Sequence, residues 1–300
     1  MICGICTCQP VTTLLGTDGT TLLNMRVALG QLPISSTPRV NLGRVREAVA
    51  SAAAQGAQLA VFPEGTQARF SADLSAVAEP LDGEFCRGLS EAARSTGVAI
   101  VAGLFEPAPD GRVYNTTVGF AGDGHLAAVY RKIHLFDALG HRESDSVAPG
   151  QDLVIAKLGG LRVGFMTCYD VRFPELARAL AAGGADLLVL PAAWAAGQFK
   201  EEHWVTLVRA RAIENTIWVA AAGQVPDTAE PATKAPTGIG RSMLVDPMGV
   251  VRLDLGPAAG LGIGDVDPGL TASVRDQLPC LANRREDVLP GGAAVLEDLS

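Results

Sequence analysis

The sequence has no apolar run near the roughly 20 residues needed to cross a bilayer, and its first 24 residues lack the basic start and long apolar core of a signal peptide. Basic residues are scarce: 24 Lys and Arg stand against 32 Asp and Glu, for a net charge of −8. Nucleic-acid binding needs clustered Lys and Arg, which are not visible here. We therefore expect a cytoplasmic protein whose partner is a small molecule, with neither nucleic acid nor a membrane bound.

Cysteine is also sparse, since six cysteines in 300 residues do not make a disulfide scaffold. Cys3, Cys6 and Cys8 include one CxxC spacing, which is compatible with a metal clip or a redox pair. No second CxxC or His pair completes a four-ligand metal site, and no strand-helix context marks a redox motif. We expect residues 1–24 to be a poorly ordered extension, with no metal or cofactor in the protein.

The remaining chain is predicted to form one domain. It is 48% hydrophobic and 19% charged, which suffices for a sizeable core, and no Pro/Gly/Ser-rich linker divides it. Regular structure is expected to begin at Met25, so we predict a domain over residues 25–287 and a tail over residues 288–300.

Apolar runs and helical patterns alternate along this domain, which predicts an α/β protein with helices covering sheet faces. Strands are predicted near residues 25–34, 59–65, 98–105, 114–121, 125–136, 161–170, 185–194 and 217–224, helices near 39–56, 83–97, 174–183 and 200–215, and a hairpin over 240–255.

Three predicted strands end in a reactive side chain: LAVFPEG ends near Glu64, VYRKIHLFD contains Lys132, and LRVGFMTCYD contains Cys168. Ligands of open α/β sheets gather beyond the carboxyl ends of strands, so three such ends on neighbouring strands would meet at one pocket. A cationic amine lowers the pKa of a thiol, and a carboxylate can accept its proton. The three side chains together therefore predict an activated cysteine nucleophile.

Each of the three residues has a structural interpretation when taken alone. A strand-end Glu is commonly solvated or ion-paired, a Lys is commonly on the surface, and a Cys in an apolar segment is commonly a small buried side chain. One observation favours a catalytic role for the lysine: only four of the 24 basic residues are lysines. A lysine can be tuned by burial and release a proton, whereas an arginine cannot.

The three segments together resemble the signature motifs of the nitrilase superfamily of carbon-nitrogen hydrolases. The motifs are FPEG around Glu64, YRKIHLFD around Lys132 and TCYDVRFPEL around Cys168, and the similarity runs from about Met25 to Asp287. The resemblance implies an α-β-β-α sandwich of two mixed β-sheets flanked by helices, paired into homodimers or larger homo-oligomers.

The resemblance also implies roles for the site residues. Glu64 would be the general base, Lys132 would stabilise the tetrahedral intermediate, and Cys168 would carry the acyl group. Glu143 matches a second glutamate of the family, which positions substrate or supports the lysine. The backbone amide of Tyr169 is the expected second oxyanion donor.

The residues after the nucleophile indicate a branch of this superfamily. The run Cys-Tyr-Asp-Val-Arg resembles the amidase branch that contains deaminated-glutathione amidase and ω-amidase, rather than the Cys-Trp-Glu of nitrilases or the Cys-Asn-Asp of carbamoylases. We therefore predict hydrolysis of a small carboxylate-bearing amide to an acid and ammonia. Arg172 would pair with the substrate carboxylate or, alternatively, with Glu175 or Asp170.

Other functions are less well supported. A nitrilase or an N-carbamoyl amino acid amidohydrolase remains an alternative, as does a binding protein on the same fold, although none of the three reactive residues is lost. No G-x-S-x-G elbow supports a serine hydrolase. The four histidines are scattered, which disfavours a metal-dependent amidohydrolase. Cys86 and Cys280 have no matched partner, so we assign them to packing or to the surface.

Overall fold

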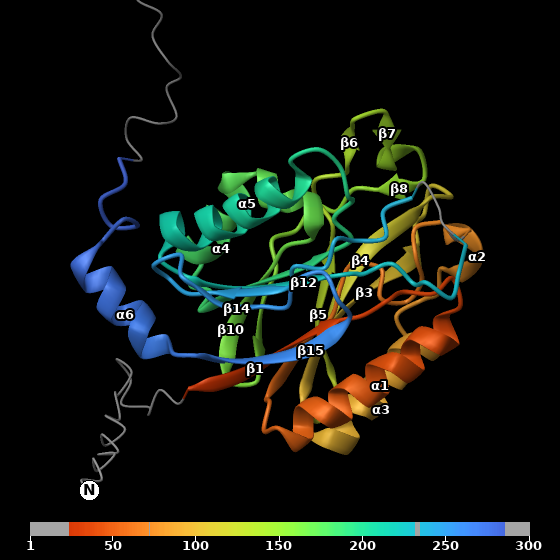
Figure 1. Cartoon of the computed structure of the whole chain (residues 1–300), viewed down its shortest axis with the longest axis horizontal. Coiled ribbons are helices and arrows are strands. Elements are labelled where there is room, and N and C mark those ends of the chain that lie inside the picture. Colours follow the sequence, from red (N-terminus) through yellow and green to blue (C-terminus); the bar gives the residue numbers. More distant parts are fainter. Residues whose placement is uncertain (1–23, 72, 232–234, 286–300) are drawn as a thin grey trace, which may run out of the picture.

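The structure is a computed structural model that describes residues 24–71, 73–231 and 235–285. Two large mixed β-sheets lie face to face, and helices cover the outer face of each (Figure 1). The predicted α-β-β-α sandwich is therefore confirmed. Apart from Asn24, the predicted extension 1–24 with its three cysteines lies outside the described residues, as does the tail 288–300, and the domain limits 25–287 stay a prediction.

The first sheet has the strand order β15-β1-β2-β3-β4-β5, and β8 pairs with β4. In this sheet β1, β2 and β3 run parallel, β4 is antiparallel to β3, and β5 is antiparallel to β4, so β5 runs in the same direction as β1 to β3. Its strands are β1 (Met25–Gln31), β2 (Leu59–Val61), β3 (Ala99–Pro107), β4 (Val113–Phe120), β5 (Leu126–Arg131), β8 (Val147–Ala148) and β15 (Gly260–Val266).

The second sheet has the order β14-β13-β12-β11-β10-β9, with β10, β11 and β12 parallel. Its strands are β9 (Ile155–Leu158), β10 (Leu161–Phe165), β11 (Leu187–Ala192), β12 (Trp218–Gly223), β13 (Met243–Val245) and β14 (Val251–Asp254). The last two form the predicted hairpin. A small separate hairpin joins β6 (Asp137–Ala138) to β7 (His141–Arg142).

The helices divide between the two outer faces. Below the first sheet in Figure 1 lie α1 and α3, and above the second lie α4 and α5. The helices are α1 (Pro38–Ala54), α2 (Leu74–Val77), α3 (Glu84–Thr96), α4 (Pro174–Ala182), α5 (Lys200–Asn215) and α6 (Pro268–Gln277), with short 3-10 turns η1 (Glu143–Asp145) and η2 (Cys168–Arg172).

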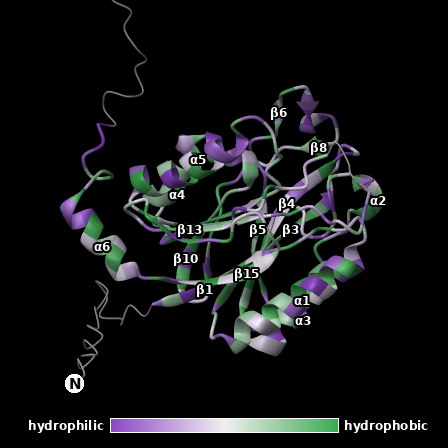
Figure 2. Cartoon of the chain, viewed as in Figure 1, coloured by the Kyte–Doolittle hydropathy of each residue, from purple (hydrophilic) through white to green (hydrophobic). Residues whose placement is uncertain are grey.

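The central strands are apolar on both faces because both faces are covered. In β11, Leu187 and Val189 point into the core between the sheets, while Leu188 and Leu190 pack under α4 and α5. This is the period-two alternation of a strand, with apolar residues at every position. Figure 2 shows the same pattern, with hydrophobic colour concentrated in the strands and mixed colour on the helices.

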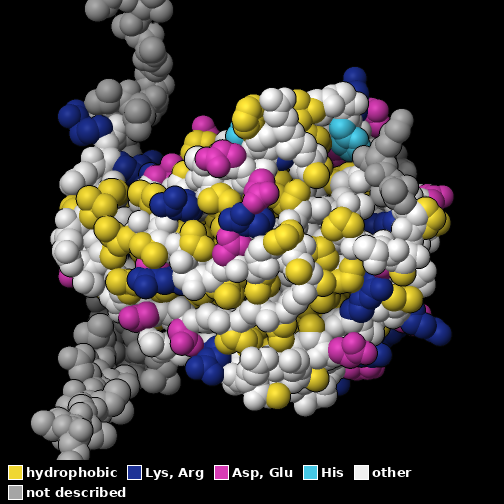
Figure 3. All heavy atoms as spheres, in the orientation of Figure 1, with side chains coloured by type: hydrophobic (Ala, Val, Ile, Leu, Met, Phe, Trp, Pro, Cys, Tyr) yellow, Lys and Arg dark blue, Asp and Glu magenta, His cyan; other side chains and the backbone are white. Residues whose placement is uncertain are grey.

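Charged side chains on the surface are interspersed rather than grouped by sign. On the face shown in Figure 3, Lys and Arg alternate with Asp and Glu across the molecule. No helix in the described ranges combines the length and the apolar character needed to span a bilayer.

Candidate active site

The three predicted residues meet where the two sheets come together. Glu64 follows β2, Lys132 follows β5 directly, and Cys168 follows β10. The expectation that these strands are neighbours is wrong, because β3 and β4 separate β2 from β5, and β10 belongs to the second sheet. The residues nevertheless converge, since all three lie in the wall of one cavity.

Glu64 is held by hydrogen bonds to both oxygens of its buried carboxylate. Oε1 accepts from Lys132 Nζ at 2.9 Å and from Asn115 Nδ2 at 2.8 Å, and Oε2 accepts from the Ala193 backbone N–H at 2.8 Å. Gly103 on β3 allows this approach, because a Cβ there would lie 2.4 Å from the Gly65 backbone nitrogen. The carboxylate is therefore fixed in one orientation, with donors on two sides.

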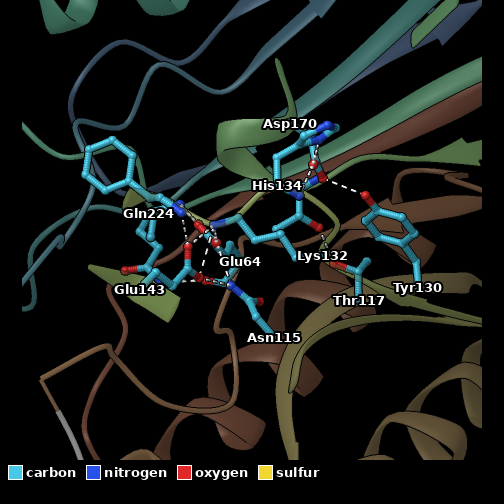
Figure 4. Close-up of polar contacts among 12 residues, drawn as sticks. Glu64, Asn115, Thr117, Tyr130, Lys132, His134, Glu143, Asp170 and Gln224 are labelled. Atoms are coloured by element: carbon cyan, nitrogen blue, oxygen red, sulfur yellow. Dashed lines mark hydrogen bonds and ion pairs between the residues drawn. The ribbon is translucent and has the colours of Figure 1, made fainter. Parts of the chain in front are cut away.

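Lys132 lies between two carboxylates (Figure 4). Its buried ammonium donates to Glu64 Oε1 and to Glu143 Oε2, each at 2.9 Å. Burial acts to lower the pKa of Lys132, but the attraction of Glu143 and Glu64 outweighs it and raises that pKa well above its ordinary value. Lys132 is therefore a fixed cation at neutral pH rather than a base.

Glu143, at the start of η1, acts as the second support of this lysine. Besides Lys132, its carboxylate accepts from the Phe136 backbone N–H at 2.7 Å and from Asn115 Nδ2 at 3.1 Å. Burial alone would raise its pKa, but Lys132 and the two hydrogen bonds lower it. Of the two family roles, support of the lysine matches these contacts.

Cys168 occupies a strained turn at the end of β10. Its φ of 47° lies in the left-handed region, which is uncommon for a residue with a side chain and frequent at functional sites. Thr167 and Asp170 form a capping box around it, with Asp170 Oδ2 accepting from the Thr167 N–H at 2.8 Å. The turn places the half-buried Cys168 in the cavity wall, with the core beneath α4 and α5 packed against it.

The Cys168 thiol is protonated in the free protein. Burial is the largest effect that raises its pKa well above the ordinary value, and the charge of Glu64 adds to it, while Lys132 acts in the opposite direction. Glu64 and Cys168 lie in the wall of the same cavity, and Glu64 is close enough to affect the pKa of the thiol. Glu64 is thus placed to take the thiol proton as the sulfur attacks.

A second polar cluster, formed by Asp170, Tyr130 and His134, stabilises the turn that carries Cys168. Asp170 Oδ2 accepts from the Tyr130 hydroxyl at 2.6 Å, and Oδ1 accepts from the His134 backbone N–H at 3.1 Å and lies 2.7 Å from its Nδ1 (Figure 4). Burial, together with Asp170, raises the pKa of Tyr130 well above its usual range, so its phenol remains a donor. This cluster ties β5 of the first sheet to the nucleophile turn of the second.

Tyr169 follows the nucleophile directly. Its ring packs edge-on against Phe136 and Phe173, with centroids 5.0 Å and 5.3 Å apart, and it lines the cavity. The predicted use of its backbone amide as an oxyanion donor stays a prediction.

Arg172 lies outside the cavity wall, and its Nη2 is 3.4 Å from His203 Nδ1. Its guanidinium carbon lies 5.0 Å from the ring centroid of Trp194 and 6.0 Å from that of Tyr169. Within the described part of the chain it forms no ion pair with Glu175 or Asp170, which were its alternative partners. Its pairing with a substrate carboxylate stays a prediction.

The cavity at this point holds about 420 Å³ of space, part of it open to solvent. Glu64, Lys132, Glu143 and Cys168 all reach its wall. The rest of the wall includes the rings of Phe70, Phe136, Tyr169 and Trp194 and the side chain of Lys200. The wall is largely apolar and carries a few converging charged groups, which is the usual composition of a small-molecule site.

Two residues of the site were not predicted from the sequence. Asn115, within β4, joins Glu64 to Glu143 through Nδ2, and Lys200, at the start of α5, lines the cavity. Nothing in the sequence marks Asn115 as a site residue, since a polar side chain is ordinary in a strand. For Lys200 the sequence gives a weak indication, because lysines are rare in this chain.

We expect Asn115→Ala to reduce kcat by up to about 100-fold, because small displacements of catalytic groups have effects of that size. The free energy of unfolding should fall by about 1–3 kcal/mol, since two buried carboxylates lose a donor. Steady-state kinetics and urea unfolding measure the two effects. Asn215→Ala is the matched control: Asn215 is also buried, with Oδ1 unpartnered, but it lies outside the cavity wall. Equal kcat values in the two variants would contradict a positioning role for Asn115.

The other described cysteines lie away from this cavity. Cys86 lies on the buried face of α3, in the core that this helix and α1 form with the first sheet, and burial raises the pKa of its thiol to about 12. This confirms the packing assignment for Cys86. Cys280 is a half-buried free thiol beyond α6.

Comparison with known proteins places these features in context. The chain matches the carbon-nitrogen hydrolase family model over residues 26–276. It is 38% identical over 265 residues to the deaminated glutathione amidase of Escherichia coli O157:H7, which covers 87% of this chain and 97% of that protein. It is 35% identical over 269 residues to the omega-amidase of Danio rerio, with 88% and 95% covered.

A solved amidase from Nesterenkonia has a similar fold. The TM-score is 0.73 at 28% sequence identity, covering 88% of this chain and 94% of that one. In that structure, of a glutamate-to-glutamine mutant, the acetamide moiety of fluoroacetamide is covalently attached to the active-site cysteine.

Proposed function

The chain belongs to the carbon-nitrogen hydrolase family, and from that premise we propose that it hydrolyses a small carboxylate-bearing amide to an acid and ammonia through a thioester on Cys168. The observation that supports this most is the position of Glu64, whose carboxylate accepts from the Lys132 ammonium at 2.9 Å and shares the cavity wall with the Cys168 thiol. Base, nucleophile and cation thus share one cavity.

In the first half of the proposed reaction, Glu64 takes the thiol proton while the sulfur attacks the amide carbon. The carbonyl oxygen becomes an oxyanion, which the Lys132 ammonium and the Tyr169 backbone N–H stabilise. Collapse of the intermediate breaks the C–N bond, and the proton held by Glu64 passes to the nitrogen. Ammonia leaves, and the acyl group remains on the sulfur.

In the second half, water replaces ammonia. Glu64, now a carboxylate again, removes a proton from the water as its oxygen attacks the thioester carbon. Lys132 stabilises the second oxyanion, the C–S bond breaks, and Glu64 returns its proton to the sulfur. Glu143 forms no bond to the reacting atoms in this scheme and keeps Lys132 in place.

The reaction type is tested by measuring ammonia release from a panel of substrates. We expect turnover of carboxylate-bearing amides such as succinamate and glutaramate, and little or none of nitriles or N-carbamoyl amino acids. Turnover of nitriles alone, or of N-carbamoyl amino acids alone, would overturn the amidase assignment. Tight binding of amides without turnover would favour a binding protein on this fold.

We further propose a homodimer or larger homo-oligomer, located in the cytoplasm. The family resemblance supports the first, together with exposed apolar side chains that lie close to one another on α5 and the turn between β13 and β14: Ile213, Met248 and Val250. The second rests on the composition of the sequence.

A further inference from the structure

Lys200 is a buried cation in the wall of the active-site cavity. It is the first residue of α5, it is only 7% exposed, and it shares the cavity with Cys168. In the catalytic scheme above it has no part, because Lys132 already supplies the cation beside the nucleophile.

No carboxylate of the described chain neutralises this cation. The acidic side chains in the cavity wall are Glu64 and Glu143, and both are bound to Lys132. Lys200 Nζ forms no ion pair or hydrogen bond with any described residue. Its three N–H donors are therefore available to a ligand.

The position is also unfavourable for a positive charge. A cation at the first residue of a helix faces the positive end of the helix dipole. Burial is the largest effect that lowers the pKa of Lys200, and the nearby charge of Arg172 lowers it further, although Cys168 acts in the opposite direction. A charge kept at such a cost in stability indicates function.

Two aromatic rings hold the ammonium in the cavity wall. Lys200 Nζ lies 4.5 Å from the ring centroid of Trp194 and 5.0 Å from that of Phe136, both within cation-π range. Trp194 is itself fixed, since its Nε1 donates to the Lys200 backbone oxygen at 2.7 Å. Aromatic rings orient a cation without neutralising it, so the charge of the Lys200 ammonium remains available to bind an anion.

We propose that Lys200 binds the carboxylate of the substrate's acyl portion and thereby sets a preference for anionic amides. This inference rests on the proposed amidase function, in which ammonia is the leaving group. Since ammonia carries no carboxylate, any anionic group of the substrate belongs to the acyl portion that stays on Cys168. Lys200 is in the cavity wall, whereas Arg172 lies outside it, with its guanidinium carbon 5.0 Å from the Trp194 ring centroid.

The test compares two substrates that differ only in charge: succinamate and its neutral isostere 4-oxopentanamide, in which a methyl group replaces one carboxylate oxygen. Lys200→Met should lower kcat/KM for succinamate by about 10- to 100-fold, the range expected for one charge-assisted hydrogen bond. The loss should appear mainly as a higher KM. The kcat/KM for 4-oxopentanamide should be unchanged.

Two further variants serve as controls. Lys157→Met removes a lysine from the exposed edge of β9, outside the cavity wall. This variant should leave kcat/KM unchanged for both substrates. Lys200→Arg keeps the charge and should retain the preference for succinamate. Thermal unfolding of each variant identifies any loss that comes from the fold.

Three outcomes would overturn the inference. Equal losses for both substrates in Lys200→Met would assign Lys200 to holding Trp194 in place, and no loss for either would remove it from binding. Wild-type turnover that is no faster with succinamate than with the neutral amide would also overturn it, while the amidase function would stand. Absence of turnover with every amide would instead overturn the proposed function.

Discussion

Replacement of Cys168 by alanine is expected to lower kcat/KM for every amide substrate by about 10⁴-fold or more, which is the scale of losses when a covalent nucleophile is removed. Without the sulfur no thioester forms, and Glu64 would have to direct water onto an unactivated amide. The fold should persist, because the substitution removes one half-buried atom at a cavity wall. Ammonia release measures the activity, and circular dichroism the fold.

The same substitution at the two other described thiols provides the control. Cys86→Ala should cost some stability, because Cys86 is packed in the core, but it should leave kcat intact. Cys280→Ala should change neither the stability nor kcat. Retention of activity in Cys168→Ala, or its loss in either control with the fold intact, would refute Cys168 as the nucleophile.

Lys132→Met has the second largest expected effect, and it acts on activity and stability together. Loss of the cation that faces the oxyanion should lower kcat by about 10²- to 10³-fold. The substitution also leaves two buried carboxylates without their cation, at a cost of about 3–5 kcal/mol in the free energy of unfolding. Steady-state kinetics and urea unfolding measure the two effects.

The pH dependence of stability should also change sign in Lys132→Met. In the native protein the lowered pKa of Glu143 stabilises the fold above the ordinary pKa of a glutamate, and this contribution is lost as the pH falls through the folded pKa. In the variant, Glu64 and Glu143 both still bond Asn115 and repel one another, which raises a carboxyl pKa in the folded state. The folded variant then binds more protons than the unfolded chain, so its stability rises as the pH falls.

A double variant separates the two consequences. In Lys132→Met/Glu143→Gln one of the two unpaired charges is removed, so stability should recover while kcat stays low. Recovery of kcat in the double variant would assign Lys132 to the fold alone. An unchanged pH dependence in the single variant would contradict the coupling of Glu64 to Glu143.

Much of the site was predictable because its reactive side chains follow apolar strands. Glu64, Lys132 and Cys168 stand at or just beyond strand ends, and side chains there gather at one edge whatever the order of the strands. The family predicted from the motifs around these residues is confirmed by the family match over residues 26–276.

The division into two sheets was not predictable in the same way. The runs that form β5 and β10 look alike in sequence, since both are short apolar strands, and the pairing that separates them joins residues far apart in the chain. β10 pairs with β11 and the preceding β9, while β5 pairs with β4. Local patterns therefore placed most of the long strands correctly, but they missed β9 and β15 and did not give the strand neighbours.

Asn115 and Lys200 show a different limit of sequence reasoning. Asn115 lies inside a strand and acts through two glutamates that are distant in sequence. Lys200 is the first residue of a helix and does not follow a strand end, and its importance depends on rings contributed by other segments. Neither residue type is unusual at its position until the fold brings these partners together.

The thioester on Cys168 can be observed directly by acid-quenched mass spectrometry of the wild-type enzyme during turnover. An activated ester, such as the mono-p-nitrophenyl ester of succinate, makes acylation fast enough for the intermediate to accumulate, and acid preserves the thioester. The expected result is a mass increase equal to the acyl group, located in the peptide that contains Cys168 and absent from Cys168→Ala. Continued ester turnover with an unmodified protein, or with the acyl group on a peptide that lacks Cys168, would contradict covalent catalysis by this thiol.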